Sequence, residues 1–343
     1  MASHGIEIKD LYKVFGPDGA KYVEMVKNGM SKAELNEKHG HVLGLKDINI
    51  SMPAGQIQVV MGLSGSGKST LIRHINRLID PTAGAVLYED VDVCQMSKAE
   101  LLEFRRHKTA MVFQKFALLP HRTVMHNTVY GLEIQGVDKA EAKKRAQRWI
   151  ERVGLDGFED HYPNQLSGGM QQRVGLARAL TNDADILLMD EAFSALDPLI
   201  RTDMQSVLLD IQQELKKTIV FITHDLDEAL RLGDRIAILR DGEVIQQGTG
   251  QEIVLNPADG YIADFIKEVN RGRVISVATI MSDTPLEEAT KVEIHPDDRL
   301  ETAAHAMAEQ EETRANVRDK SGNLVGSLLL KDTISAMVTA ATH

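Results

Sequence analysis

The hydrophobic positions of the chain follow two rhythms, one typical of β-strands and the other of α-helices. Short and nearly continuous apolar runs, such as 185–190 and 218–223, predict buried strands of a parallel sheet. Apolar residues that recur every three or four positions over 138–153 and 200–215 predict amphipathic helices. Because strands and helices of this kind alternate, we expect an α/β fold with a mainly parallel core sheet.

The same patterns, with local turn and capping signals, predict the remaining elements. Further strands are expected at 6–9 with a continuation over 11–15, and at 42–52, 56–61, 85–88, 109–113, 235–240 and 243–247. Further helices are expected at 31–38, 71–78, 97–106, 225–232 and 257–269. Asp241-Gly242 predicts a hairpin turn, and the polar stretch 20–41 is interpreted as an insertion between two strands of one sheet.

Residues 62–70 read Gly-Leu-Ser-Gly-Ser-Gly-Lys-Ser-Thr and fit the phosphate-loop pattern G-x-x-x-x-G-K-[ST]. A predicted strand precedes them and a predicted helix follows, so backbone N–H groups and a helix N-terminus would face one anion. A chance glycine-rich turn is the alternative, and this context disfavours it. The predicted nucleotide-binding residues are Gly62, Ser64, Gly65, Ser66, Gly67, Lys68, Ser69 and Thr70. Lys68 would reach the β- and γ-phosphates, and the hydroxyl of Ser69 would hold Mg²⁺.

A second helix N-terminus suited to anions lies about a hundred residues later, at Ser167-Gly168-Gly169. One ATP cannot easily occupy both sites within one chain. We therefore expect a dimer in which each ATP lies between the phosphate loop of one copy and the Ser-Gly-Gly turn of the other.

With these motifs in this order, residues 6 to about 250 resemble the ATP-binding-cassette ATPases. The resemblance implies a P-loop NTPase cassette over 1–270, with an antiparallel β subdomain and a helical subdomain at about 115–180. It also implies that Asp190 positions Mg²⁺ and that Glu191 is the general base for the attacking water. An acidic strand end without catalytic function is the alternative for this pair.

The resemblance assigns four further positions. It implies that Gln114 senses Mg²⁺ and the attacking water, that His224 contacts the γ-phosphate, and that Asp197 belongs to a loop coupling the two sites. A purely structural histidine is the alternative for His224. The family also stacks adenine on an aromatic side chain, for which Phe15 is the first candidate and Tyr12 the second.

Composition narrows the functional classes. The formal net charge of −11 argues against nucleic acid as a main partner, because a phosphate backbone needs a basic surface. No apolar run reaches the ~20 residues of a membrane helix, and residues 1–9 lack the apolar centre of a signal peptide, so we expect a cytoplasmic chain. The single cysteine, Cys94, excludes an intramolecular disulfide and suits a reducing compartment. Trp149 lies on an apolar helix face and is interpreted as a core residue.

One cassette without a fused membrane segment, a repair-type coiled coil or a basic face indicates the separate ATPase subunit of a transporter, and we expect an importer. Segments 113–121, 190–201 and 21–32 resemble the glycine betaine/proline osmoprotectant importers. This implies small quaternary-amine or zwitterionic cargo of the glycine betaine, proline betaine, choline and trimethylamine N-oxide class. The implied partners are an integral-membrane permease and, indirectly, an extracytoplasmic solute-binding protein.

The implied location is peripheral, on the cytoplasmic face of the inner membrane. The alternatives are the ATPase of an amino-acid importer and a non-transport cassette ATPase. The loop 115–123 is expected to expose Phe116, Leu118 and Leu119 for the permease, with core packing as the alternative.

A polar break at 270–273 predicts a domain boundary, and the remaining residues 274–343 partly resemble a single CBS module. The segments 280–282, 294–300 and 319–326 carry this likeness, with helices expected at 300–309 and from 331. The module is expected either to regulate the ATPase or to support its dimerisation.

Overall fold

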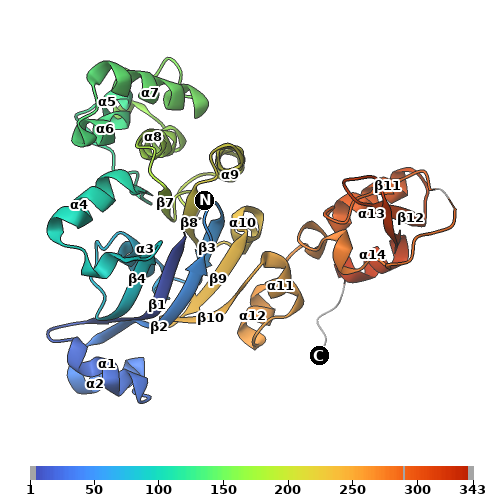
Figure 1. The fold of residues 1–343 in the computed structure, drawn as a ribbon, viewed down its shortest axis with the longest axis horizontal. Coiled ribbons are helices and arrows are strands. Elements are labelled where there is room, and N and C mark those ends of the chain that lie inside the picture. Colours follow the sequence, from blue (N-terminus) through green and yellow to red (C-terminus); the bar gives the residue numbers. More distant parts are fainter. Residues whose placement is uncertain (1–4, 289, 339–343) are drawn as a thin grey trace. The chain divides into compact units, whose positions relative to one another are not determined.

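The computed structural model describes residues 5–288 and 290–338. The chain divides into two compact units, Met1–Gln247 and Gly248–His343, and Figure 1 draws the helices and strands of both in sequence colours. Among the described residues, no helix combines the length and the apolar character that spanning a membrane requires.

The first unit is built on a six-stranded sheet with the order β10-β9-β3-β8-β7-β6. These strands are β3 (Ile57–Met61), β6 (Thr109–Val112), β7 (Ile186–Asp190), β8 (Thr218–Thr223), β9 (Arg235–Arg240) and β10 (Glu243–Gly248). The pairs β3–β8, β3–β9, β7–β8 and β6–β7 are parallel. Every residue of β3, β7 and β8 is buried, which confirms the predicted parallel core.

A second, antiparallel sheet has the order β2-β1-β4-β5. It consists of β1 (Ile6–Phe15), β2 (Val42–Met52), β4 (Ala83–Tyr88) and β5 (Val91–Asp92). Side chains from both sheets and from α3 (Lys68–Ile75) form one apolar core, in which Ile48, Leu71 and Leu188 are almost fully buried. Burying a side chain of this size stabilises the fold by about 1.5–3 kcal/mol, so this shared core fixes α3 between the sheets.

The hairpin predicted at Asp241-Gly242 is present between β9 and β10. Both residues have positive φ, at 52° and 88°, as a two-residue turn of this type requires. The N–H of Gly242 donates to the carbonyl of Ser66 at 3.1 Å, and the N–H of Lys46 donates to the carbonyl of Gly242 at 2.8 Å. Through these hydrogen bonds, the turn links the segment 62–70 to β2 and holds it in place.

The insertion contains two helices, α1 (Ala20–Lys27) and α2 (Lys32–His39), where only the second was predicted. The capping box of Ser31 and Glu34 marks the start of α2. The start of α1 has no side-chain cap, so the sequence holds no signal for it. Leu35 and residues of β1 and β2 form a small separate core, and Figure 1 shows both helices beside these strands.

Helices form the rest of the first unit: α4 (Lys98–His107), α5 (Val124–Thr128), α6 (Tyr130–Gln135), α7 (Lys139–Arg152), α8 (Gly168–Thr181), α9 (Pro198–Leu215) and α10 (Leu226–Leu232). A short 3₁₀ turn, Pro163–Gln165, precedes α8. The short helices α5 and α6 were not predicted, since five or six residues do not develop a helical repeat. Trp149 is 9% exposed on the buried face of α7, which agrees with its interpretation as a core residue.

The second unit has its own apolar core and a three-stranded sheet, in which β11 pairs parallel to β12 and β12 antiparallel to β13. Its elements are α11 (Gly250–Leu255), α12 (Gly260–Phe265), β11 (Glu293–Ile294), α13 (Leu300–Glu309), β12 (Arg314–Arg318), β13 (Leu324–Leu329) and α14 (Leu330–Val338). The single helix expected at 257–269 is wrong in extent, because Asp259 caps a helix that ends at Phe265. The predictions for α13 and α14 are correct to within one residue at their starts.

Helix α11 belongs to the second unit. Gln251 accepts a hydrogen bond from the N–H of Ser276 at 2.9 Å and donates to Thr279 at 2.6 Å, and Leu255 packs on the core of this unit. In the sequence, the second compact unit therefore begins at Gly248. The functional boundary at 270–274 stays a prediction.

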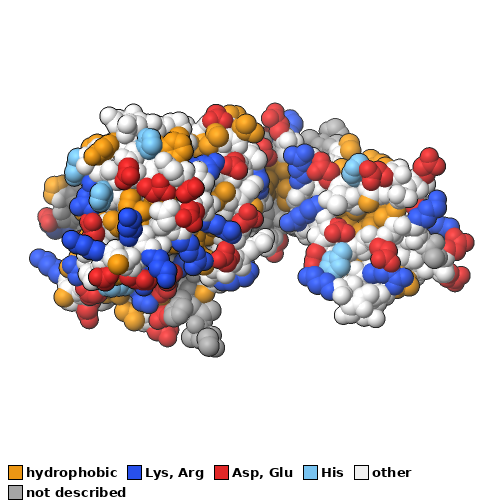
Figure 2. Space-filling model, turned by 90° about the horizontal axis from the view of Figure 1, so that it is seen from above, with side chains coloured by type: hydrophobic (Ala, Val, Ile, Leu, Met, Phe, Trp, Pro, Cys, Tyr) orange, Lys and Arg blue, Asp and Glu red, His pale blue; other side chains and the backbone are white. Residues whose placement is uncertain are grey.

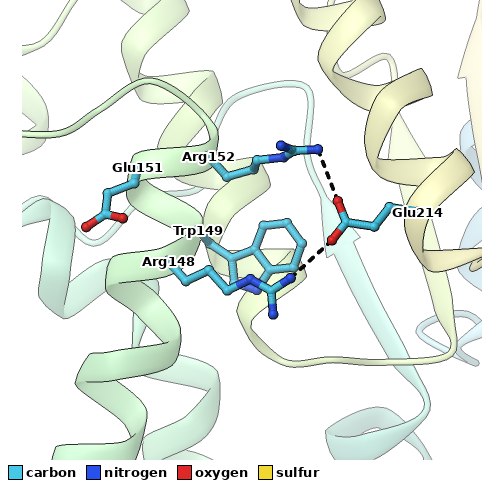
Figure 3. A pocket seen from close by; sticks show the side chains of 5 residues that line it. All are labelled: Arg148, Trp149, Glu151, Arg152 and Glu214. Atoms are coloured by element: carbon cyan, nitrogen blue, oxygen red, sulfur yellow. Dashed lines mark hydrogen bonds and ion pairs between the residues drawn. The ribbon is translucent and has the colours of Figure 1, made fainter.

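An ion-pair clamp, defined by Arg148, Arg152 and Glu214, joins α7 to α9 (Figure 3). The carboxylate of Glu214 lies 3.1 Å from Arg148 and 3.0 Å from Arg152. Glu151 lines the same pocket but points away from Glu214 (Figure 3), and Gln147 donates to it at 3.0 Å. Glu214 of α9 thus holds two arginines of α7 in place.

We predict that Glu214→Gln lowers the free energy of unfolding by no more than about 1 kcal/mol, because all three charged groups are partly exposed. The variant should also lose part of the salt dependence of the melting temperature, since both ion pairs disappear. Glu151→Gln is the matched control and should keep it. Equal salt dependence in the wild type and Glu214→Gln would contradict the clamp.

Candidate nucleotide site

The phosphate loop connects β3 to α3 and depends on glycine at two close approaches. A Cβ on Gly62 would lie 2.2 Å from the carbonyl oxygen of Leu239, and a Cβ on Gly67 would lie 2.9 Å from that of Gly44. Both glycines also have positive φ, at 152° and 104°. Helix α3 begins at Lys68, three residues before the predicted start. The loop forms a cradle that side chains would fill, and this fits the binding of phosphate groups.

Lys68 is buried, and its ammonium lies across the loop. Its Nζ donates to the carbonyls of Gly62 at 2.8 Å and Leu63 at 3.0 Å, and it lies 3.8 Å from the carboxylate of Glu191. Burial lowers the pKa of Lys68, whereas the charges of Glu191 and Asp190 act in the opposite direction. An anionic ligand in the loop would further favour the charged ammonium.

Asp190 is the last residue of β7 and faces the first turn of α3. The hydroxyl of Ser69 donates to its Oδ1 at 2.8 Å, and Arg73 lies 3.4 Å from its Oδ2. A hydroxyl beside a carboxylate is the oxygen donor set that Mg²⁺ prefers. Arg73 was not predicted. Its position four residues after Ser69, on the same helix face, is the signal that could have found it.

Glu191 lies at the centre of the predicted catalytic residues. The side chain of Gln114 donates to its Oε2 at 2.9 Å, and Nδ1 of His224 is 3.7 Å from its Oε1. Glu191 itself has a φ of 46°, an uncommon value for a side chain other than glycine that is often found at functional sites. The structure therefore brings Lys68, Gln114, Glu191 and His224 together from four separate segments.

Of the two aromatic candidates for adenine, only Phe15 presents a ring to solvent. Phe15 is 38% exposed, whereas Tyr12 is 6% exposed and belongs to the small core under the insertion. The ring of Phe15 packs on Gly44, where a Cβ would lie 2.6 Å from its Cε2, and the ammonium of Lys13 is 5.1 Å from its centre. Adenine stacking on Phe15 stays a prediction.

The Ser-Gly-Gly turn opens α8. The hydroxyl of Ser167 accepts from the N–H of Met170 at 3.3 Å, and Gly168 and Gly169 form the start of the helix. Asp197 caps α9 in the same way, through the N–H of Ile200 at 3.1 Å.

Within the described parts of the chain, no hydrogen bond or ion pair joins the Ser-Gly-Gly turn or Asp197 to the phosphate-loop cluster. In one chain, the two halves of the predicted ATP site remain separate.

The loop after Gln114 is less exposed than predicted. Phe116, Leu118 and Leu119 are all half-buried. Arg178 of α8 donates to the carbonyls of Phe116 at 3.1 Å and of the following Ala117 at 2.7 Å, and the N–H of Leu119 donates to Asn127 at 2.8 Å. These hydrogen bonds hold the loop against the helical region, which explains the partial burial.

Comparisons with known proteins agree with this geometry. Residues 45–194 match the model of the family described as ABC transporter. A glycine betaine transport ATP-binding protein of Bacillus subtilis is 55% identical over 276 residues, which cover 80% of this chain and 66% of that protein. A glycine betaine/carnitine transport ATP-binding protein of Listeria monocytogenes is 47% identical over 342 residues, covering 98% of this chain and 85% of the relative. This chain belongs to the ABC transporter family.

A solved structure supports the cassette fold. A dimeric ATP-binding cassette in a post-hydrolysis state, bound to ADP and phosphate, aligns with a TM-score of 0.61 at 32% identity. The alignment covers 71% of this chain and 98% of that structure. The predicted P-loop cassette fold, with its parallel core sheet, antiparallel sheet and helical region, is confirmed.

His74 on α3 is expected to make the fold sensitive to acid. Its ring is fully buried, with Nδ1 2.7 Å from the carbonyl of Thr70 and no partner for Nε2 among the described residues. Burial lowers the pKa of His74 from 6.5 to about 4. Between pH 6.5 and pH 4, His74 is protonated in the unfolded chain but stays neutral in the folded chain, so acid favours unfolding.

We predict that His74 alone reduces the free energy of unfolding by about 3 kcal/mol between pH 6.5 and pH 4. Denaturant titrations over this range should show a smaller loss in His74→Gln. His107→Gln changes an exposed histidine on α4 and serves as the control. The assignment fails if His74→Gln and His107→Gln have the same acid dependence.

Proposed function

We propose that the chain is the ATP-hydrolysing subunit of an importer for small quaternary-amine or zwitterionic solutes, of the glycine betaine, proline betaine, choline and trimethylamine N-oxide class. The convergence of Lys68, Gln114, Glu191 and His224 on one sheet edge carries the enzymatic part of this proposal. The two relatives at 55% and 47% identity, both named for glycine betaine transport, support the cargo class.

ATP hydrolysis uses these residues in distinct roles. Lys68 and the backbone of 62–70 bind the β- and γ-phosphates. The carboxylate of Glu191 orients a water and takes its proton as the water oxygen bonds to the γ-phosphorus. The bond from that phosphorus to the bridging oxygen breaks, which leaves ADP and phosphate. Gln114 holds the Glu191 carboxylate in place, and His224 contacts the γ-phosphate.

Mg²⁺ is the predicted metal of this site. Ser69 and Asp190 would hold it, with Gln114 beside them, and when bound it would neutralise charge on the phosphate oxygens. The hydroxyl–carboxylate contact of 2.8 Å between Ser69 and Asp190 supports this assignment.

The working form is a dimer of two copies. Each ATP is bound by the phosphate loop of one copy and by Ser167, Gly168 and Gly169 of the other, with Asp197 close to the contact. The exposed start of α8 supports this arrangement, as does the dimeric state named for the related cassette.

A membrane permease is the second partner, and it places the chain at the cytoplasmic face of the inner membrane. The half-buried Phe116, Leu118 and Leu119, directly after Gln114, are candidates for the contact surface. An extracytoplasmic solute-binding protein would act through the permease. On the face drawn in Figure 2, acidic and basic side chains are interspersed over the chain.

The segment 274–343 is proposed as a single CBS-like module that regulates the ATPase or supports its dimerisation. A separate apolar core and the β11-β12-β13 sheet support an independent module. Ile334 and Val338, one turn apart on α14, are exposed apolar side chains that suit a protein contact.

We predict that Glu191→Gln retains MgATP binding and dimerises with ATP, while its hydrolysis rate falls by about 10²–10⁴-fold, because the amide cannot accept the proton of water. Phosphate release and gel filtration with ATP measure the two properties. Glu141→Gln, which changes an exposed glutamate of α7, should hydrolyse normally. Turnover near the wild-type rate in Glu191→Gln would remove Glu191 as the base.

The cargo is tested by reconstituting the chain in liposomes with a permease that co-purifies with it and a candidate solute-binding protein. We expect glycine betaine to stimulate ATP hydrolysis and to enter the liposomes, whereas methionine does neither. Stimulation by methionine alone would favour an amino-acid importer, and failure to co-purify with any permease would favour a non-transport ATPase.

A further inference from the structure

His41 closes the base of the insertion, directly before β2. Its ring is buried, with a residue exposure of 6%. Nδ1 lies 2.7 Å from the carbonyl oxygen of His39, and Nε2 lies 2.7 Å from that of Pro17. Carbonyl oxygens only accept hydrogen bonds, so both contacts are satisfied only when both ring nitrogens carry a hydrogen. The geometry therefore selects the imidazolium form.

The groups around His41 also favour a positive charge. The ring of Tyr22 on α1 lies 4.3 Å from the His41 ring between centroids and also contacts His39. Asp18 is the nearby carboxylate, and Lys21 pairs with it at 2.7 Å. The hydrogen bonds to the Pro17 and His39 carbonyls raise the pKa of His41, with a smaller contribution from Asp18 and an opposing one from desolvation.

His41 is connected to the adenine candidate through the backbone. Phe15 pairs with Val42 across β1 and β2, so His41 lies next to its cross-strand partner. Gly16 packs under the imidazole, where a Cβ would be 2.4 Å from Cδ2 of His41. The hydrogen bond to Pro17 then fixes the turn that follows Phe15 in the sequence. The His41 ring thus holds the residues on both sides of the Phe15–Val42 pair, which are Gly16 and His41 itself.

We propose that the doubly protonated His41 is a positioning residue for the nucleotide: it fixes the turn after Phe15 and thereby holds the Phe15 ring for stacking on adenine. This inference rests on the proposed ATPase function and on the predicted stacking of adenine on Phe15. When His41 loses its proton, one of its two carbonyl contacts loses its donor, and the turn is released.

The sign of the pH effect follows from this contact. Folding and base stacking favour the protonated ring, so the stabilised state is complete at low pH and is lost as the pH rises through the raised pKa of His41. Only the contribution of the base should change, because no hydrogen bond among the described residues joins His41 or the turn at 16–18 to residues 62–70. Loss of one hydrogen bond corresponds to about a fivefold change in affinity.

The experiment compares ATP with inorganic tripolyphosphate, which lacks the base. Both compete against a fluorescent ATP analogue on the full chain, at several pH values from about 6 to 9. Dividing the wild-type dissociation constant by that of His41→Gln cancels the titration of the nucleotide phosphates. We expect wild-type ATP affinity to fall about fivefold more than that of His41→Gln across this range, with no such difference for tripolyphosphate.

His39→Gln is the matched control, since His39 touches the same tyrosine and has no hydrogen bond to its ring nitrogens among the described residues. It should keep the wild-type pH dependence. Nitrogen-15 NMR of the histidine rings in the wild type reads the His41 protonation state directly. A His41 pKa that is not raised above that of an ordinary histidine would overturn the inference, even if His41→Gln did not fold.

Two further outcomes separate the inference from the proposed function. If Phe15→Ala weakens ATP but not tripolyphosphate, while His41→Gln keeps the wild-type pH dependence, the inference about His41 is wrong and the adenine assignment stands. If Phe15→Ala changes neither ligand, the adenine assignment fails, and the inference fails with it. Equal changes for ATP and tripolyphosphate in His41→Gln would mark a merely structural residue.

Discussion

The site depends on the parallel register of three buried strands. Met61 of β3 pairs with Thr223 of β8, and Ile222 of β8 pairs with Asp190 of β7. All three strands therefore end at the same edge, and the residues that follow them emerge within one small region. Gly62, Glu191 and His224 are each the first residue beyond a strand. A register shift of one residue would move these groups apart and turn buried side chains toward the wrong face.

The same constraint explains why so much of the site could be predicted from the sequence. The phosphate loop, Asp190 and His224 each follow an apolar run, and parallel strands bring such positions to one edge. The hairpin at Asp241-Gly242 and the capping box at Ser31 could also be predicted, because each depends on the chemistry of a few adjacent residues. The roles of Gln114, Asp190, Glu191 and His224 required a family resemblance, and the contact of 2.9 Å between Gln114 and Glu191 agrees with it.

Features that depend on distant contacts were missed. Helix α1 starts without a side-chain cap and is held by the small core beneath it. Phe116 was expected on the surface, but the guanidinium of Arg178, about sixty residues away, binds its carbonyl and draws the loop inward. The contacts of His41 with Pro17 likewise appear only when the insertion has folded back on itself. Local patterns carry no information about such pairs.

The back of the phosphate loop has a consequence for how this enzyme can vary. Gly44, Gly67 and Gly242 come from three distant segments and meet there at main-chain distance, with the side chain of Leu45 beside them. A smaller residue in place of Leu45 would not make room for a side chain at Gly67, because the carbonyl of Gly44 lies equally close and no substitution shortens it. Compensating pairs of substitutions are therefore closed to Gly67, and we expect changes in nucleotide affinity to arise at the rim, around Phe15 and the insertion.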